Sequence, residues 1–200
     1  MSEFTVVPTK QLHIDNQVLS HINHLRLDNI SSLEMPPKQS LIKSSSYYLM
    51  KLLSNVLYQQ ETSLDQQLKN ESLFLKIKSF FSYIYDFAQL SGSELIYTIY
   101  LVQKLVNSEI QDFIEDNDCI MIADSNIGTT LICAVILAMK ILRDPTEMKS
   151  NIWWAKSFGM SLELLNQSEM EFYMQLDFNV SLDEQQFIRL YSQILSYSEV

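Results

Sequence analysis

The chain has 200 residues, a formal net charge of −10 and a pI of about 4.7, and 47% of its residues are hydrophobic. This length suits one ordinary domain with a real core, whereas the acidic balance disfavours nucleic acid and anionic membrane surfaces as partners. With only three glycines and four prolines, the chain has too few turn residues for a sheet-rich fold, so long helices are predicted.

The cysteines, the N-terminus and the apolar runs indicate an intracellular protein without a bound metal or cofactor. Cys119 and Cys133 form neither a disulfide framework nor a metal-ligating cluster, and Cys133 lies in an apolar run as a small core residue. The first residues lack the basic and apolar regions of a signal peptide. The longest apolar run, 131–139, is far shorter than the roughly 20 residues that span a bilayer. We therefore expect a protein of the cytoplasm and/or nucleus that is neither secreted nor bound to a membrane.

Residues 1–44 are predicted to be an irregular or flexible N-terminal segment, because their apolar residues follow no sustained period. The serines at 44–46 are interpreted as part of the linker before the first helix. His21 and His24 could share one helical face, but no third ligand lies nearby in the sequence, so no metal site is predicted. Residues 45–200 are predicted to be a helical domain.

Three helices are predicted in the first part of this domain. The first begins at Tyr47, where apolar residues recur at spacings of three and four. After a polar link, the second spans about 71–90 and carries a wide stripe of aliphatic and aromatic residues. Ser91 and Glu94 form a capping box that starts the third helix, which runs to about Ile110.

The fourth predicted helix is the most informative element. Asp124 or Ser125 is predicted as its N-cap, and it ends before Pro145, because proline cannot continue a helix. Between 131 and 139 it has no polar face, and a helix that is apolar all round must be covered by other helices. A buried central helix at about 126–143 therefore defines an all-α bundle.

Three further helices follow this central helix. A short one is predicted over about 151–158, with Gly159 as its C-cap. Ser161 can cap the next, which spans about 162–176. A second capping box, over 181–184, is predicted to start the C-terminal helix.

No catalytic motif is found, so the chain is predicted not to be an enzyme. It has no glycine-rich phosphate loop, no nucleophile elbow and no histidine in the predicted helical domain. The acidic stretch 115–118 lacks the spacing and the closing glutamate of a calcium-binding loop. Glu163, Glu169 and Glu171 lie on one amphipathic helix, where carboxylates usually form the solvated face.

Lys140 and Glu169 form a candidate protein-binding site. Each also has a simple structural explanation, because a lysine in the last turn of a helix suits the helix dipole and a glutamate on an amphipathic helix faces solvent. However, Lys140 is the first charge after the buried helix, so its ammonium must emerge where the core meets the surface. If Glu169 emerges beside it, a groove bordered by Leu137, Ile141 and Tyr173 carries one charge of each sign. Such a groove suits the backbone and polar side chains of a partner helix.

Several short motifs follow one another in a recognisable order between about 47 and 195. Around the central helix they are Asn126, Ala138-Met139-Lys140, Asp144, Asn151, Gly159, Leu165-Asn166-Gln167-Ser168-Glu169 and Leu176-Asp177-Phe178-Asn179-Val180. Before it, 90–95 stands at a helix turn, and 100–105 begins with tyrosine and ends with lysine and leucine. Together these motifs resemble the cyclin box, most closely that of the P/U-type (yeast phosphate-pathway-like) cyclins.

The resemblance implies a single cyclin box, which is a five-helix bundle around the buried central helix, with an extra helix before it and one after it. It implies a regulatory cyclin subunit that forms a heterodimer with a cyclin-dependent protein kinase and activates it by positioning its regulatory helix. In the family, the residues at the positions of Lys140 and Glu169 contact the kinase. The implied apolar contacts are Leu137, Ile141, Tyr173, Phe178 and Val180.

The chain departs from the family pattern at two places, and two other functions stay open. Gly128-Thr129 replaces the usual His-Arg after Asn126, and the arginine common in the first box helix is absent. The second departure leaves open whether that helix carries a substrate-docking patch. The first alternative function is a cyclin-fold adaptor that binds another protein without activating a kinase. The second is a helical enzyme, for which the sequence offers no polar pocket.

Overall fold

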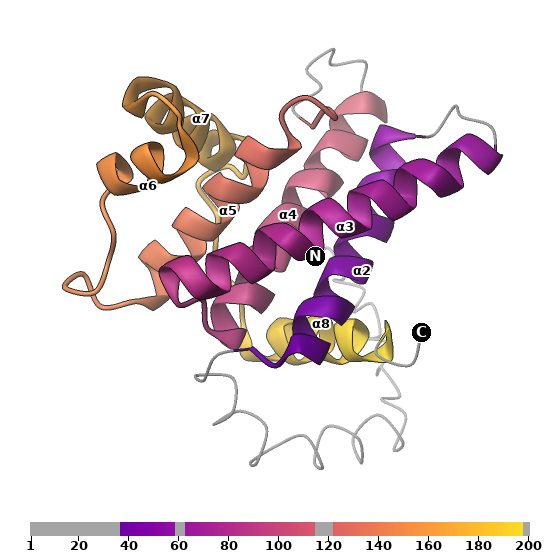
Figure 1. Ribbon diagram of the computed structural model, residues 1–200, viewed down its shortest axis with the longest axis horizontal. Coiled ribbons are helices and arrows are strands. Elements are labelled where there is room, and N and C mark those ends of the chain that lie inside the picture. Colours follow the sequence, from indigo (N-terminus) through magenta and orange to yellow (C-terminus); the bar gives the residue numbers. More distant parts are fainter. Residues whose placement is uncertain (1–36, 59–62, 115–121, 198–200) are drawn as a thin grey trace, which may run out of the picture.

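Seven helices make up the described part of the chain in the computed structural model (Figure 1), which covers residues 37–58, 63–114 and 122–197. They are α2 (Gln39–Leu57), α3 (Ser63–Ala88), α4 (Gly92–Ile114), α5 (Ile127–Leu142), α6 (Asn151–Phe158), α7 (Leu162–Gln175) and α8 (Glu184–Ser196). No strand occurs in these ranges, so the predicted all-α fold is confirmed. The three histidines, the acidic stretch 115–118 and the predicted irregular segment up to residue 36 lie outside the described residues.

The central helix of the bundle is α5, as its apolar sequence predicts. Every side chain from Thr130 to Met139 is buried, and α4 and α7 both pack against this helix. The helix ends at Leu142, and the extended backbone of Arg143 leads into the Asp144-Pro145 turn. The chain therefore leaves the core immediately after Lys140 and its neighbours.

The other helices lie around α5 in two groups (Figure 1). α6 and α7 pair at one end of the bundle, whereas α8 lies at the other end against α2 and α4. α2 also packs along α3 and α4. The five helices from α3 to α7 thus have one helix before them and one after them, as the predicted fold requires.

The first helix begins earlier than predicted. α2 starts at Gln39, so residues 39–44 are helical, and the irregular segment predicted for 1–44 is wrong over these residues. The hydroxyls of Ser44 and Ser46 donate to backbone carbonyls four residues earlier, at 2.9 and 2.7 Å. These hydrogen bonds satisfy the serine hydroxyls within the helix, so serine can occupy a helix interior. The serine-rich composition of 44–46 had suggested a linker instead.

The polar link that was predicted before the second helix is also helical. α3 begins at Ser63 rather than at 71. The glutamine, lysine and leucine residues there favour a helix without needing a buried face. Leu64 and Leu68 accordingly stay exposed. Apolar periodicity alone therefore underestimates the length of α3.

Local capping signals located three helix ends correctly. The Ser91 amide donates to the Glu94 carboxylate at 2.8 Å, and the Glu94 amide donates to the Ser91 hydroxyl at 3.2 Å, which is the predicted capping box. Ser161 caps α7 by accepting a hydrogen bond from a backbone amide. Gly159 ends α6 in the left-handed conformation.

Two predicted caps are wrong. The residue before α5 is Asn126, not either predicted residue, and its side chain turns back to accept a hydrogen bond from the Ala123 amide at 2.9 Å. α8 is capped by Asp183, whose capping box closes with Gln186, instead of beginning at Ser181. In both places several polar residues able to cap stand side by side, so residue type does not select one of them.

Replacing Gly159 with alanine is expected to lower the free energy of unfolding by about 1 kcal/mol. Gly159 has a φ of +64°, and no atom lies within 4 Å of the position that a Cβ would occupy. The cost is therefore the conformational energy of a left-handed residue with a side chain. Urea denaturation measures it, with Gly128→Ala in the first turn of α5 as control, because that substitution should not destabilise. An equal loss at both glycines would contradict this explanation.

An aromatic layer joins α3 to α6. Phe87 stacks on Trp153 with 4.4 Å between ring centroids, and Tyr83 meets Phe158 edge-on at 5.8 Å. Such ring pairs contribute about 0.5–1.5 kcal/mol each beyond the area that they bury. They fix the position of α6, whose first residue, Asn151, reaches the candidate site.

Candidate functional site

Lys140 and Glu169, the two charged residues selected from the sequence, form an ion pair. The Lys140 ammonium donates to both carboxylate oxygens of Glu169, at 2.6 and 2.8 Å. Lys140 lies in the last turn of α5, and Glu169 lies on α7, 29 residues later in the chain. Their side chains are 32% and 13% exposed, so the pair lies where the core meets the surface.

Two asparagines complete a polar cluster around Glu169. The side-chain nitrogen of Asn151 donates to Glu169 at 2.6 Å and to the side-chain oxygen of Asn166 at 2.8 Å. Because two acceptors face this nitrogen, reversing the amide would place oxygens against oxygens. The remaining oxygen of Asn151 is buried without a hydrogen-bond partner among the described residues. Glu169 is thereby held from α6 as well as from α5.

The five apolar residues predicted beside the charged pair differ in exposure. Ile141 and Phe178 are 39% and 55% exposed, whereas Leu137 is 8% exposed and belongs to the core. Tyr173 and Val180 are half-buried. The rings of Tyr173 and Phe178 meet edge-on with 5.0 Å between centroids. Ile141, Tyr173 and Phe178 therefore offer apolar surface, while Leu137 lies beneath it.

Two exposed methionines that were not predicted extend this surface. Met170 and Met174 are 55% and 54% exposed and lie one turn apart on α7. Met170 lies three residues before Tyr173 and four before Met174, spacings that make these side chains neighbours on the helix surface. Flexible, polarizable methionine side chains are common at protein-binding surfaces. Their four-residue spacing was visible in the sequence, but it does not distinguish a surface from a core.

We call the exposed and half-exposed residues of this region the α5–α7 surface. It consists of Lys140, Ile141, Glu169, Met170, Tyr173, Met174 and Phe178.

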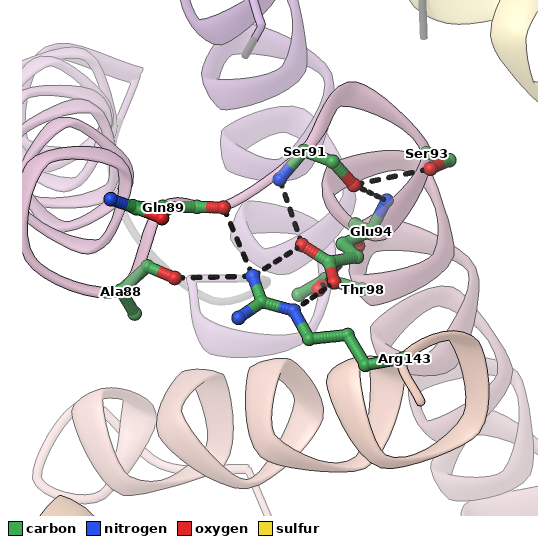
Figure 2. Close-up of polar contacts among 7 residues, drawn as sticks. All are labelled: Ala88, Gln89, Ser91, Ser93, Glu94, Thr98 and Arg143. Atoms are coloured by element: carbon green, nitrogen blue, oxygen red, sulfur yellow. Dashed lines mark hydrogen bonds and ion pairs between the residues drawn. The ribbon is translucent and has the colours of Figure 1, made fainter. Parts of the chain in front are cut away.

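Arg143 ties the end of α5 to the turn between α3 and α4 (Figure 2). Its guanidinium donates to the two carboxylate oxygens of Glu94 at 2.5 and 2.9 Å. It also donates to the backbone carbonyls of Ala88 and Gln89 at 3.1 and 2.9 Å. Glu94 is 3% exposed, and the hydrogen bond to its carboxylate raises the pKa of Arg143 further above its usual range. The guanidinium therefore stays charged and closes the end of α3.

This network fixes the part of α5 that carries Lys140, which lies one turn before Arg143. A carboxylate as buried as Glu94 needs a cation or several donors, and here it has both. No role was predicted for Arg143, because its partner is 49 residues away in the sequence. The sequence did contain one indication that Glu94 needs a cationic partner. The capping box places this acidic residue at the start of a largely apolar helix.

The described residues contain no cluster of three or more histidine, cysteine, aspartate or glutamate side chains that could hold a metal ion. Burial raises the pKa of the Cys133 thiol to about 12, so this thiol stays protonated at neutral pH and is a core residue, as predicted. Within the part of the chain that the structure describes, no helix has both the length and the apolar character needed to cross a membrane.

The described residues form an all-helical domain in which an ion pair lies beside exposed apolar side chains, and comparison with protein families identifies the domain. The family model described as Cyclin matches residues 69–180, which include most of α3 and all of α4 to α7. The chain therefore belongs to the cyclin family. The helices α3 to α7 are its cyclin box, α5 is the buried central helix, and α2 and α8 are the flanking helices. Searches of curated proteins and of solved structures found no match.

Proposed function

We propose that the chain is a regulatory cyclin that forms a heterodimer with a cyclin-dependent protein kinase and activates it. The observation that carries this proposal is the α5–α7 surface, where the Lys140–Glu169 ion pair is accompanied by several exposed apolar side chains. Large apolar side chains gathered on the surface of a domain indicate a protein-binding site. Membership of the cyclin family makes a kinase the expected partner.

The proposed effect on the kinase is allosteric. Ile141, Tyr173 and Phe178 would pack against the kinase around its regulatory helix, while Lys140 and Glu169 would bind polar groups of the kinase backbone and side chains. Leu137 and Val180 would support these contacts from beneath. Holding the regulatory helix inward completes the kinase's own lysine–glutamate ion pair, which orients the ATP phosphates. In this proposal the chain itself performs no chemistry.

The P/U-type subgroup and an intracellular location belong to the same proposal. Support for the subgroup comes from Asn151, Asn166 and Glu169, three positions of the family resemblance that form one polar cluster. Cyclin-dependent kinases act inside the cell, so the proposed partner implies the cytoplasm and/or the nucleus.

Co-purification followed by a kinase assay tests this function. The tagged chain is isolated from its native cells, and the kinase recovered with it is purified and assayed with and without the chain. We expect a kinase that is inactive alone and active in the complex. A kinase that binds without being activated would contradict the activating role. Recovery of a partner that is not a kinase would instead support the cyclin-fold adaptor.

A further inference from the structure

A row of three donors on α4 holds the linker between α7 and α8. Tyr97, Tyr100 and Lys104 lie on one face of α4, because positions i, i+3 and i+7 align along a helix. Their side chains donate hydrogen bonds to the three successive backbone carbonyls of residues 179–181. The bonds from Tyr100 and Lys104 measure 2.6 and 2.5 Å. We call these three residues the donor row.

The linker adopts an unfavourable backbone conformation just before these carbonyls. Asp177 and Phe178 have φ values of +53° and +56°, and neither residue is glycine. A side chain at positive φ crowds the backbone, so such residues persist only where surrounding contacts determine their conformation. The backbone amides of Asp177 and Phe178 donate to the last carbonyls of α7 at 2.8 and 3.1 Å, and that of Asn179 donates to the carbonyl of Leu176 at 2.9 Å. Local bonds therefore hold the first part of the linker, and the donor row holds the second.

This conformation presents a phenylalanine to solvent. Phe178 is 55% exposed, although its neighbour Leu176 is only 2% exposed. Because the ring of Phe178 is not removed from water, it contributes little hydrophobic stabilisation to offset the backbone strain. The edge-on contact with Tyr173 gives the exposed ring a defined orientation. The strain is therefore better explained by presentation of the ring to a partner.

We infer that Tyr97, Tyr100 and Lys104 are positioning residues that hold the 177–181 linker in the conformation that presents Phe178 to the kinase. This inference rests on the proposed function. Its physical basis is preorganisation, because a linker that is already ordered in the free chain loses no further freedom on binding. If the donors are removed and the competent conformation falls to about a tenth of the population, the apparent affinity falls about tenfold.

The test uses variants that remove the donors and keep the core. Tyr97 is 6% exposed, so Tyr97→Phe removes its hydroxyl and leaves its ring in place. Tyr100→Phe and Lys104→Met likewise keep the ring and the aliphatic stem. Tyr100 and Lys104 line an open cavity of about 680 Å³ between α4 and α8, so solvent can enter where the donors are lost. Lys104→Arg keeps a donor, and Asn107→Ala changes an exposed residue on the same helix as a matched control.

The free chain is measured first. Hydrogen exchange of the backbone amides of 177–181 should become faster in the triple variant Tyr97→Phe, Tyr100→Phe, Lys104→Met, while the amides of α4 and α7 keep their wild-type rates. Thermal melting should stay close to that of the Asn107→Ala control. Unchanged exchange in the linker would overturn the inference, since the donor row would then not hold it.

Kinase binding is measured next, with the kinase that co-purifies with the wild-type chain as the probe. The triple variant should bind about tenfold more weakly, and restoring a donor with Lys104→Arg should recover part of the loss. Combined with Phe178→Ala, the triple variant should bind no more weakly than Phe178→Ala alone, because the donor row acts through Phe178. A merely structural role would give additive losses and would overturn the inference.

Two outcomes separate this inference from the function on which it rests. If the triple variant binds the kinase normally while Lys140→Ala binds weakly, the inference is overturned and the proposed function stands. If Lys140→Ala and the triple variant both bind normally, the proposed kinase interface has failed, and the inference fails with it.

Discussion

Arg143→Met is expected to lower the free energy of unfolding by about 3–5 kcal/mol, because it leaves a buried charge without its partner. The side chains of Arg143 and Glu94 are 15% and 4% exposed, so water cannot readily replace the lost guanidinium. The variant also removes the donors to the carbonyls of Ala88 and Gln89 at the end of α3. Urea denaturation at neutral pH measures the change.

Two further variants distinguish the loss of the ion pair from a general effect of removing an arginine. Arg189→Met changes an exposed arginine on α8 that donates to the Gln185 side chain at 3.5 Å, and it should alter stability by about 0.5 kcal/mol or less. Adding Glu94→Gln to Arg143→Met should recover part of the loss, because a neutral amide costs less to bury than an unpaired carboxylate. A loss of about 1 kcal/mol or less for Arg143→Met would indicate an ordinary surface pair and contradict the buried network.

Lys140→Ala or Glu169→Ala is expected to weaken kinase binding by about 2–5 kcal/mol, which is roughly 30-fold or more in affinity. Each substitution leaves one charge of the α5–α7 surface without its partner when the kinase covers it. Both variants should still fold, because a pair whose lysine is one-third exposed contributes only about 1 kcal/mol or less to stability. Titration with the co-purified kinase measures the affinity, and thermal melting confirms folding.

Exchanging the two charges separates folding from recognition. The double variant Lys140→Glu with Glu169→Lys keeps opposite charges across α5 and α7. Like Glu169→Ala it removes the acceptor of Asn151, but it retains a charge pair, so it should be more stable than Glu169→Ala. The charges it presents to the kinase are reversed, so its affinity should stay at least as low as that of the single variants. Wild-type affinity in this folded double variant would refute the assignment of Lys140 and Glu169 to the interface.

Features of the fold that depend only on residues close together in the sequence could be predicted from the sequence. The apolar run of α5 indicated a buried central helix, and a helical end follows directly from a residue such as Gly159. The early starts of α2 and α3, at Gln39 and Ser63, could not be predicted in this way. The first turn of α2 combines polar residues with Leu41 and Ile42, which are buried only because other helices cover them. The first turns of α3 are mostly polar and exposed, so they show no apolar period.

In the candidate site, too, some residues could be predicted from the sequence, whereas contacts between distant residues could not. Lys140 and Glu169 could be selected because they occupy ordered positions in a family pattern. The contact between Arg143 and Glu94 joins residues 49 positions apart, and that between Tyr100 and the linker joins residues 81 positions apart. No spacing within a single helix indicates such pairs, because they exist only after the bundle has packed. Long-range polar contacts are therefore the part of the site that required the structure.

Both tryptophans of the chain, Trp153 and Trp154, lie on α6. Trp153 stacks on Phe87, and Trp154 is buried. Tryptophan emission from this protein therefore arises from one short helix, whose first residue is the Asn151 that binds Glu169. Any displacement of that helix when a partner engages Glu169 should move the emission spectrum, whereas circular dichroism averages over every helix. The molecule thus contains a natural optical probe of the proposed binding surface, so the proposed binding can be tested without attaching a dye.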